Sequence, residues 1–526
     1  GARPEKDDAV LWVDFDFKSI AEPKARNVSE YDSFLNSQAD EVKRATDVPR
    51  LVRVAVRAPK QASNVNALDE VPDSSWYTNR HALRHMTADQ LVQGPNRGKP
   101  PDFSHATIIK AKLEGVTPGL QLRDNDGTDY MIKFDNKNYP ELQSGAEVIS
   151  TKILYASGYN VPENYIAYVD PRTLEIKDGM EIGNGKSKHA FTREDLDGML
   201  QHAAKRADGK YRVLASKILK GKPKGPFAYI GVRSDDANDL IPHEHRRELR
   251  GLRVIASWIN HWDLKEMNTL DMYVEEGGRK FLRHFLIDFG SSLGGGKSPL
   301  EYFHGREYAF DGANLFKELF TLGLYVTPDE KSAPLVFPEV GILSAMDFNP
   351  GDWKPSFPVV PFENMTSEDA FWATRVILSF SEDDLLNIVK TAEYSNPMVT
   401  DYMLKVLLER RQLVARYWLK KVNPIGGFTL GVEAGGPVLQ FKDMAVDARL
   451  AGPAEYRYEM TASPDREGDG RRDHGTTTLT RIPLGKMAGA ETLVRIWTTR
   501  DKHSFRPVLI SVRRPEGAHR ILRIDR

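Results

Sequence analysis

The spacing of apolar residues changes along the chain and divides it into four zones. Residues 1–103 mix short apolar pieces with polar and Pro-rich stretches. Residues 104–232 mostly alternate with a period of two, which is typical of strands, whereas residues 233–423 carry a helical period that a strand pair at 269–288 interrupts. Residues 424–526 return to alternating or β-branched segments between turns, the clearest at 477–482, 492–498 and 507–512. The pattern predicts an α+β chain of several domains.

One strand in the second zone has an unusual composition. After a turn signal at 124–127, the sequence Tyr130-Met131-Ile132-Lys133-Phe134 predicts a strand. A period of two places Met131 and Lys133 on one face and the three other side chains on the opposite face. A lysine in so apolar a strand is costly unless an anion or a carboxylate meets it. We therefore expect Lys133 to face a negative group.

The next segment predicts a helix that begins at Pro140 and ends at Gly158, because proline favours the first turn of a helix and glycine its end. Glu147 lies inside this helix, and two interpretations of it stay open. It could close a capping box with Ser144, as a local helix device. The early start at Pro140 instead favours an interior carboxylate beside a site. The buried stripe of the helix is predicted to contain Leu142, Ala146, Ile149 and Ile153.

The clearest chemical signal is the run His261-Trp262-Asp263-Leu264-Lys265-Glu266-Met267-Asn268, followed by a hairpin that ends in Asp288-Phe289-Gly290. The turn lies near residue 278, so that Asn268 and Asp288 are predicted to face each other at the open end of the hairpin. An amide oxygen and a carboxylate there suit Mg²⁺, with phosphate oxygens and water as further ligands. Asp263 lies just upstream and could accept a proton from an incoming hydroxyl group.

These motifs resemble those of the protein-kinase superfamily. The pattern His261-x-Asp263-x-Lys265-x-x-Asn268 is similar to the catalytic loop, and Asp288-Phe289-Gly290 is similar to the metal-binding motif. Met131-Ile132-Lys133 is similar to the strand whose lysine holds the α- and β-phosphates, with Glu147 as the helix partner of that lysine. The resemblance implies ATP and Mg²⁺ as ligands. It implies catalytic-loop roles for Asp263, Lys265 and His261 (the histidine a structural one), nucleotide contacts for Lys133, Glu147 and Met131, and metal ligation by Asn268 and Asp288.

The departures from the eukaryotic kinase pattern point to an atypical group. The full Gly-rich phosphate loop is missing, and Gly115 and Gly119 are the candidates for backbone contacts with phosphate. Trp262 replaces the common arginine of the loop, and no Ala-Pro-Glu follows. Residues 291–297 look more like the segment found in lipid kinases and in the bacterial HipA-like and CotH-like groups. Residues 71–80 resemble the opening of uncharacterised exported bacterial proteins.

The resemblance implies a two-lobed protein-kinase-like fold. Residues 104–232 would form a β-rich N-lobe, with an insertion at about 171–210 in which a helix begins at Thr192. Residues 233–423 would form the helical C-lobe. An N-terminal extension, 1–103, is expected to pack on this core, and an accessory domain like a β-sandwich, 424–526, to follow it.

The expected activity is transfer of the γ-phosphate of ATP to a hydroxyl acceptor, either protein Ser/Thr or a small molecule. Two alternatives use the same fold, namely a nucleotide-binding pseudokinase that acts as an interaction protein and an enzyme that transfers AMP. A third belongs to another class, because residues 290–294 satisfy the G-x-S-x-G pattern of hydrolases. The segment runs into Gly295-Gly296 rather than into a helix, which argues against that class. Residues 243–245, His-Glu-His, are interpreted as a solvated face rather than a metal site.

The composition of the chain excludes several kinds of partner and site. The 526 residues are too many for one core, and 73 Lys+Arg against 74 Asp+Glu give a net charge of -1, which indicates no nucleic-acid partner. No apolar run approaches the roughly 20 residues of a transmembrane helix. The absence of cysteine excludes disulfides, thiolate metal sites and thiol nucleophiles, and it fits an oxidising compartment. With Gly rather than Met first, we expect an exported or periplasmic protein whose leader has been removed; the alternative is a cytoplasmic one.

Overall fold

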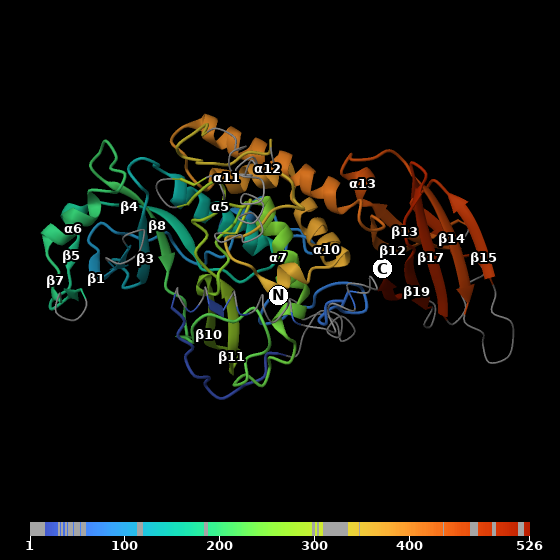
Figure 1. Cartoon of the computed structure of the whole chain (residues 1–526), viewed down its shortest axis with the longest axis horizontal. Helices are drawn as coiled ribbons and strands as arrows, with labels where there is room; N and C mark the ends of the chain where they lie inside the picture. Colours follow the sequence, from blue (N-terminus) through green and yellow to red (C-terminus); the bar gives the residue numbers. More distant parts are fainter. Residues whose placement is uncertain are drawn as a thin grey trace.

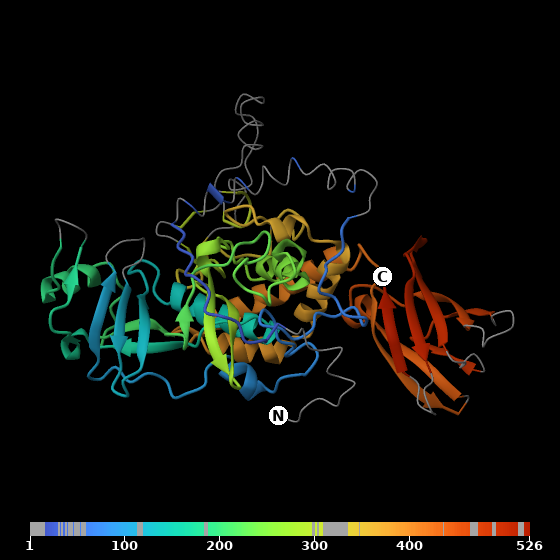
Figure 2. The ribbon, with the colours of Figure 1, turned by 90° about the horizontal axis from the view of Figure 1, so that it is seen from below.

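The computed structural model arranges the chain in three parts, with a β-sheet at one end, a helical region in the middle and further β-sheets at the other end (Figures 1 and 2). Because helices and sheets both contribute, the predicted mixed α+β class is confirmed. No helix among the residues that the model describes is long and apolar enough to cross a membrane. The described residues are 16–29, 59–112, 119–183, 188–296, 335–346, 348–434, 436–462, 472–485, 491–513 and 520–526, with scattered positions between 32 and 53 and between 300 and 308.

The first sheet has six strands in the order β4-β8-β3-β2-β1-β5, and only the β1–β5 pair is parallel. The predicted turn at 124–127 joins β2 to β3, with Gly127 at a φ of 78°. The predicted insertion contributes β5 to the sheet edge and begins its helix at the cap Thr192. The elements are β1 Thr107–Lys112, β2 Gly119–Arg123, β3 Asp129–Phe134, β4 Asn164–Val169, β5 Glu175–Ile176, β6 Glu181–Ile182, β7 His189–Ala190, α6 Arg193–Leu200 and β8 Tyr211–Lys217.

The two faces of β3 differ as the alternation predicts. Tyr130, Ile132 and Phe134 are buried in the core that the sheet shares with the insertion. Met131 and Lys133 lie on the opposite face and remain partly exposed. The lysine therefore leaves the apolar core and faces a different part of the molecule.

Helix α5, Leu142–Ser157, begins two residues after the predicted start. Its cap is Glu141, with a φ of 64°. Ser144 lies inside the helix, where its backbone N–H donates to Asp135 Oδ1 at 2.8 Å, so the capping-box interpretation of Glu147 is wrong. The helix ends at Gly158 as predicted, because the φ there is 118° and a Cβ would collide with the ring of Tyr77.

Helix α5 is buried on nearly every side rather than along one stripe. The exceptions to burial are Gln143 and Tyr155. Ala146, Ile149 and Ile153 belong to the core of the helical region, not to that of the sheet. On its other side, the helix contacts β3, β4 and β8. It therefore joins the sheet to the helical region.

The helical region surrounds a second core, which also includes side chains from the N-terminal extension. Trp76 and Tyr77 are buried there beside Trp258 and Trp372. Arg212 of β8 reaches this region and donates to the backbone oxygen of Glu393 at 2.7 Å. The elements are α4 Ala88–Gln93, α7 Arg247–Trp258, α9 Val360–Glu363, α10 Ser367–Leu378, α11 Glu382–Lys390 and α12 Pro397–Trp418, together with the small sheet of β9 Lys222–Pro223, β10 Thr269–Glu276 and β11 Arg279–Leu286.

The C-terminal part consists of two sheets around a common core, as a sandwich requires. The predicted strands at 492–498 and 507–512 correspond to β17 and β19. The predicted strand at 477–482 is wrong, because Thr477 Oγ1 accepts the backbone N–H of Leu479 and the chain turns there. One sheet contains β12 Ile425–Glu433, β13 Gly436–Asp443 and β16 Arg481–Pro483; the other contains β14 Glu455–Ala462, β15 Arg472–Thr477, β17 Glu491–Arg500, β18 His503–Ser504, β19 Val508–Arg513 and β20 Arg520–Asp525.

Candidate active site

Lys133 lies between two carboxylates that come from distant parts of the chain. Its Nζ is 2.8 Å from Asp288 Oδ1 and 3.6 Å from Glu147 Oε2. Strand β3 supplies the lysine, α5 supplies the glutamate and the segment after β11 supplies the aspartate. The lysine and aspartate side chains are 27% and 47% exposed, whereas the glutamate is 3% exposed. A ligand can therefore reach Lys133 and Asp288 from solvent.

The charges of these three groups influence one another. Burial lowers the pKa of Lys133, but the two carboxylates raise it by more, and the ammonium stays charged. Burial also raises the pKa of Asp288, yet the charge and the hydrogen bond of Lys133, together with smaller contributions such as the charge of Lys265, outweigh this effect and leave that pKa below its ordinary value. Burial dominates at Glu147, whose pKa lies above its ordinary value. Asp288 is thus the more strongly ionised partner.

The hairpin that leads to Asp288 has a different register from the predicted one. Thr269 pairs with Leu286, and Gly277-Gly278 forms the two-residue turn, with φ values of 56° and 74°. Asn268 is therefore opposite Ile287, whose N–H donates to the Asn268 backbone oxygen at 3.0 Å. The predicted direct pairing of Asn268 with Asp288 is wrong by one residue, because the turn is centred between two glycines.

Asp288 follows the last pair of the hairpin in a left-handed conformation, with a φ of 62°. Aspartate tolerates this conformation better than most residues, although it remains uncommon outside glycine. The change of backbone direction ends the strand geometry after Ile287. The position of the carboxylate beside Lys133 therefore depends on this local backbone turn as well as on the hairpin.

Asn268 ends the short 3₁₀ turn Glu266–Asn268 and is 7% exposed. Its side-chain Nδ2 donates to the backbone oxygen of Asp263 at 2.7 Å. This bond uses the nitrogen of the amide and leaves the amide oxygen as an acceptor. Together with the Asp288 carboxylate, that oxygen suits a hard divalent cation that receives its remaining ligands from phosphate and water. Among the described residues, no cluster of three or more acidic or histidine side chains could hold a metal alone.

Asp263 and Lys265 form a pair within the loop that precedes Asn268. Lys265 Nζ lies 3.4 Å from Asp263 Oδ2, and both side chains are mostly buried. The backbone oxygen of Lys265 also accepts the N–H of Asn268 at 2.9 Å. The candidate base and the candidate metal ligand are therefore held in one loop by hydrogen bonds.

His261 is buried and connects this loop to the chain after Asp288. Its Nδ1 lies 3.3 Å from the backbone oxygen of Ser291, and its ring meets Phe289 edge-on at 5.6 Å. Burial lowers the pKa of His261, which keeps the ring neutral near physiological pH. Trp262 adds a second link, because its Nε1 donates to the Gly295 backbone oxygen at 3.1 Å. Both residues hold the two loops together.

The predicted nucleotide residues of the sheet lie beside Lys133. Gly119 is directly opposite Lys133 in the pairing of β2 with β3, and Met131 shares the face of Lys133. A Cβ added at Gly119 would lie 3.8 Å from Met131 Sδ. Because Gly119 has no side chain, the surface of the sheet beside Met131 is left uncovered at this position. Gly115 lies outside the described residues.

The hydrolase alternative fails on geometry. The serine of the pattern is Ser292, which is fully buried and donates to the Phe289 backbone oxygen at 2.6 Å. No helix follows in residues 293–296. A nucleophile elbow requires an exposed serine that enters a helix.

The interpretation of residues 243–245 as a solvated face is also wrong. His243 is 2% exposed, and its Nε2 lies 2.7 Å from Asp239 Oδ2. Its ring meets Trp76 edge-on. The sequence could not reveal this burial, because Trp76 comes from the N-terminal extension.

Comparison with known proteins finds only distant structural matches. No family model matches the chain, and no curated protein matches it. Three solved kinase structures share 11–12% identity with it. The Helicobacter pylori proinflammatory kinase CtkA has a TM-score of 0.33 and covers 61% of this chain and 98% of its own. Two structures of the Golgi casein kinase, one with Mn/ADP bound, have TM-scores of 0.26 and cover 76% of this chain and 95% or 96% of their own. These TM-scores are too low to establish a shared fold or activity.

Proposed function

We propose that the chain is an ATP- and Mg²⁺-dependent phosphotransferase of the atypical kinase type. The observation that carries the proposal is the position of Lys133 Nζ between the carboxylates of Asp288 and Glu147, on the sheet face that also presents Met131. A charged lysine at that point can hold phosphate oxygens. The acceptor is a hydroxyl group of protein Ser/Thr or of a small molecule.

Lys133 would hold the α- and β-phosphates, and Glu147 would orient it. Glu147 Oε2 is buried without a hydrogen-bond partner, although it lies 3.6 Å from the lysine. A buried, unsatisfied carboxylate oxygen favours the approach of a donor. When a cation takes the charge of Asp288, we expect Lys133 to move toward Glu147.

Asn268 and Asp288 would hold Mg²⁺ through an amide oxygen and a carboxylate oxygen. When bound, the ion supplies positive charge that neutralises the phosphate oxygens. The hydrogen bond from Asn268 Nδ2 to the Asp263 backbone supports this role, since it directs the nitrogen of the amide elsewhere. The lowered pKa of Asp288 supports it as well, because a metal ligand must be ionised.

Asp263 would accept the proton of the acceptor hydroxyl. The acceptor oxygen then forms a bond to the γ-phosphorus, the bond from that phosphorus to the bridging oxygen breaks, and ADP leaves. Lys265 Nζ, 3.4 Å from Asp263, would stabilise the transferred phosphoryl group and the aspartate. His261 would act structurally, by holding the loop against the segment after Asp288.

The test is to incubate the full chain with ATP, Mg²⁺ and a mixture of protein and sugar acceptors, and to measure ADP, pyrophosphate and intact mass. The kinase proposal requires ADP and a gain of phosphate on the chain or an acceptor. Replacing the base should slow the reaction by about 10²–10⁴-fold. We therefore expect this loss in Asp263→Asn, with ATP binding nearly unchanged, and no loss in the exposed control Asp401→Asn.

The other outcomes separate the alternatives. Pyrophosphate with a gain of AMP would indicate AMP transfer. Tight ATP binding with neither product would support the pseudokinase. Absence of ATP binding, with or without Mg²⁺, would overturn the whole proposal.

We also propose that residues 104–232 and 233–423 act as two lobes with the site between them, and that 424–526 is an accessory domain. Separate cores in the sheet, the helical region and the sandwich support this division. Helix α5 is the exception, since Ala146, Ile149 and Ile153 belong to the core of the helical region.

A further inference from the structure

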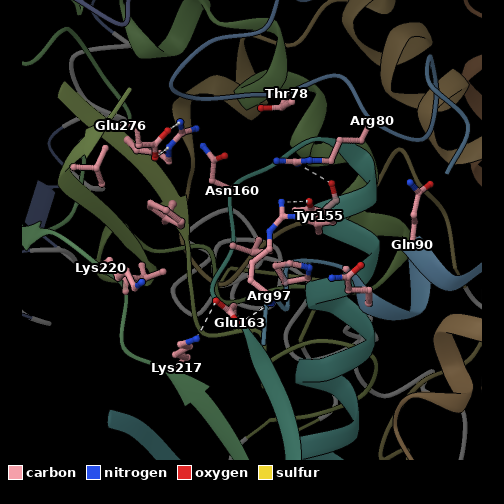
Figure 3. A pocket seen from close by; sticks show the side chains of 18 of the residues that line it. Thr78, Arg80, Gln90, Arg97, Tyr155, Asn160, Glu163, Lys217, Lys220 and Glu276 are labelled. Atoms are coloured by element: carbon pink, nitrogen blue, oxygen red, sulfur yellow. Dashed lines mark hydrogen bonds and ion pairs between the residues drawn. The ribbon is translucent and has the colours of Figure 1, made fainter. Parts of the chain in front are cut away.

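A second site is indicated by a cavity of about 760 Å³ that none of the proposed catalytic residues lines. It lies among the N-terminal extension, the end of α5, the connection that leaves β8 and the β10–β11 hairpin (Figure 3). Its size is that of a pocket for a small organic ligand. We call it the basic cavity.

The basic cavity is strongly positive, although the whole chain carries a net charge of only -1. Two acidic side chains, Glu163 and Glu276, also line it, and basic side chains already engage both. Lys217 Nζ lies 3.5 Å from Glu163 Oε1, and Arg283 Nε donates to Glu276 Oε1 at 2.9 Å. The basic side chains are Arg80, Arg84, Arg97, Lys217, Lys220 and Arg283.

Three of these cations have no carboxylate partner among the described residues, namely Arg80, Arg97 and Lys220. Arg80 donates to the backbone oxygens of Tyr155 and Tyr159, at 2.8 and 3.0 Å, and stacks on the Tyr155 ring. Arg97 donates to the Tyr155 hydroxyl at 3.1 Å. The two arginines thus lie beside one tyrosine, while Lys220 lies across the cavity (Figure 3). Neutral partners fix the arginines without cancelling their charge.

The remaining lining combines apolar and aromatic side chains with polar ones, and the polar ones are Thr78, Asn79, Gln90, Gln93 and Asn160. Tyr155 and Phe285 supply rings, and Met86, Val161 and Val274 supply aliphatic surface. Arginine binds phosphate oxygens with a geometry that carboxylates share, and rings stack on flat apolar groups. An anion alone would use only part of this surface.

We propose that the basic cavity binds a small organic phosphate whose ester group is apolar or aromatic. The phosphate would meet Arg80 and Arg97, Lys220 would attract it from across the cavity, and the ester would lie against Tyr155 and Phe285. The proposal does not depend on the phosphotransferase activity, because the site shares no residue with the Lys133 site.

Calorimetry on the full chain without Mg²⁺ tests the proposal with 1-naphthyl phosphate, 1-naphthol and inorganic phosphate as probes. We expect one molecule of naphthyl phosphate to bind, at least about tenfold more tightly than either fragment, because both parts of the cavity contribute. Phenyl phosphate and AMP are included as esters of other sizes. No binding of any of the three esters would overturn the proposal.

Variants locate the binding. The double variant Arg97→Glu/Lys220→Glu changes two exposed positions, and charge reversal should weaken naphthyl phosphate binding by at least about tenfold. The matched control Lys405→Glu/Lys420→Glu, on exposed positions of α12 and just beyond it, should bind like the wild type. Lys133→Met should also bind normally. Binding lost in Lys133→Met but kept in the double variant would overturn the assignment, and thermal unfolding curves would check that every variant is folded.

Discussion

The Lys133 site and the basic cavity both contain cations that can hold phosphate, but their electrostatic settings are opposite. At the first site, one lysine meets the two carboxylates of Glu147 and Asp288. The basic cavity is lined by six basic side chains and only two acidic ones. The Lys133 site is therefore suited to a phosphate that binds together with a metal cation, whereas the basic cavity can bind a phosphate without a metal. Mg²⁺ dependence should therefore separate the two sites.

The largest expected effect comes from removing the negative charge of Asp288. Asp288→Asn should abolish the Mg²⁺-dependent part of ATP binding and slow phosphate transfer by at least about a hundredfold, since a metal supplies several kcal/mol of charge stabilisation. Calorimetry with and without Mg²⁺, together with single-turnover assays, measures both. Naphthyl phosphate binding should stay unchanged. A variant that keeps Mg²⁺-assisted ATP binding would contradict the assignment of the metal ligand.

Higher ionic strength should weaken phosphate binding in the basic cavity more than it weakens the ion pairs of Lys133. Raising the salt from 0.01 to 0.15 M shortens the Debye length from about 30 to about 8 Å, and exposed charges that lie farther apart than this length lose most of their interaction. We therefore expect the affinity gap between the wild type and Arg97→Glu/Lys220→Glu to shrink severalfold. Titrations of naphthyl phosphate at both salt concentrations test this expectation. A gap that does not depend on salt would indicate steric rather than electrostatic damage.

A smaller effect is expected at Glu147, whose carboxylate is buried but lies farther from Lys133 than that of Asp288. Glu147→Gln should weaken ATP binding by about tenfold, as for the loss of one positioning charge in a partly buried pair. The free energy of unfolding should not fall in this variant, because Lys133 keeps Asp288 as its partner. Equilibrium denaturation and ATP titration of the same preparation give both values. A collapse of stability with normal ATP binding would argue for a purely structural role.

Glu147→Gln should also change how the free energy of unfolding depends on pH. The pKa of Glu147 is raised above its ordinary value of 4.5 by burial, so the folded state holds this proton more tightly than the unfolded state. The free energy of unfolding contributed by this group therefore falls as the pH rises above 4.5 through the raised pKa. We expect the wild type to lose stability relative to Glu147→Gln over that range. Denaturation at several pH values measures the difference, and a difference of the opposite sign would contradict the pKa direction.

The smallest effect is expected at Arg84. Its side chain is 57% exposed, and its NH2 group lies 3.1 Å from Asp73 Oδ2. A surface ion pair of this kind contributes at most about 1 kcal/mol. Arg84→Gln should therefore change the free energy of unfolding by about 0.5 kcal/mol and naphthyl phosphate binding only slightly. A large loss of binding would extend the phosphate contacts to Arg84.

Much of the fold could be predicted where the pattern is local. The alternation of β3 identified the face of Lys133, and glycine identified the end of α5. The start of α5 was misplaced because the backbone turns at Glu141, which no propensity signals. The burial of His243 was missed for another reason, since its neighbour Trp76 lies far away in the sequence.

In the candidate site, too, some features could be predicted from local sequence and others could not. Its motifs were visible in the sequence, but the pairing of Asn268 with Asp288 was shifted by one residue. The two-glycine turn of the hairpin sets that register, because its centre lies between Gly277 and Gly278, whereas the prediction centred the turn on residue 278. The basic cavity had no sequence signal at all, because its cations come from segments that meet only in the folded chain.

Local signals in the chain were enough to predict the elements whose patterns lie within one turn or one strand, together with the loop residues Asp263 and Asn268, because side-chain periodicity and turn chemistry act between near neighbours. Contacts in the folded chain decided which carboxylate lies nearer to Lys133, how the backbone turns at Asp288 and where cations gather that have no carboxylate partner among the described residues. Those features depend on packing between distant segments, and long-range packing leaves no periodic trace in the chain.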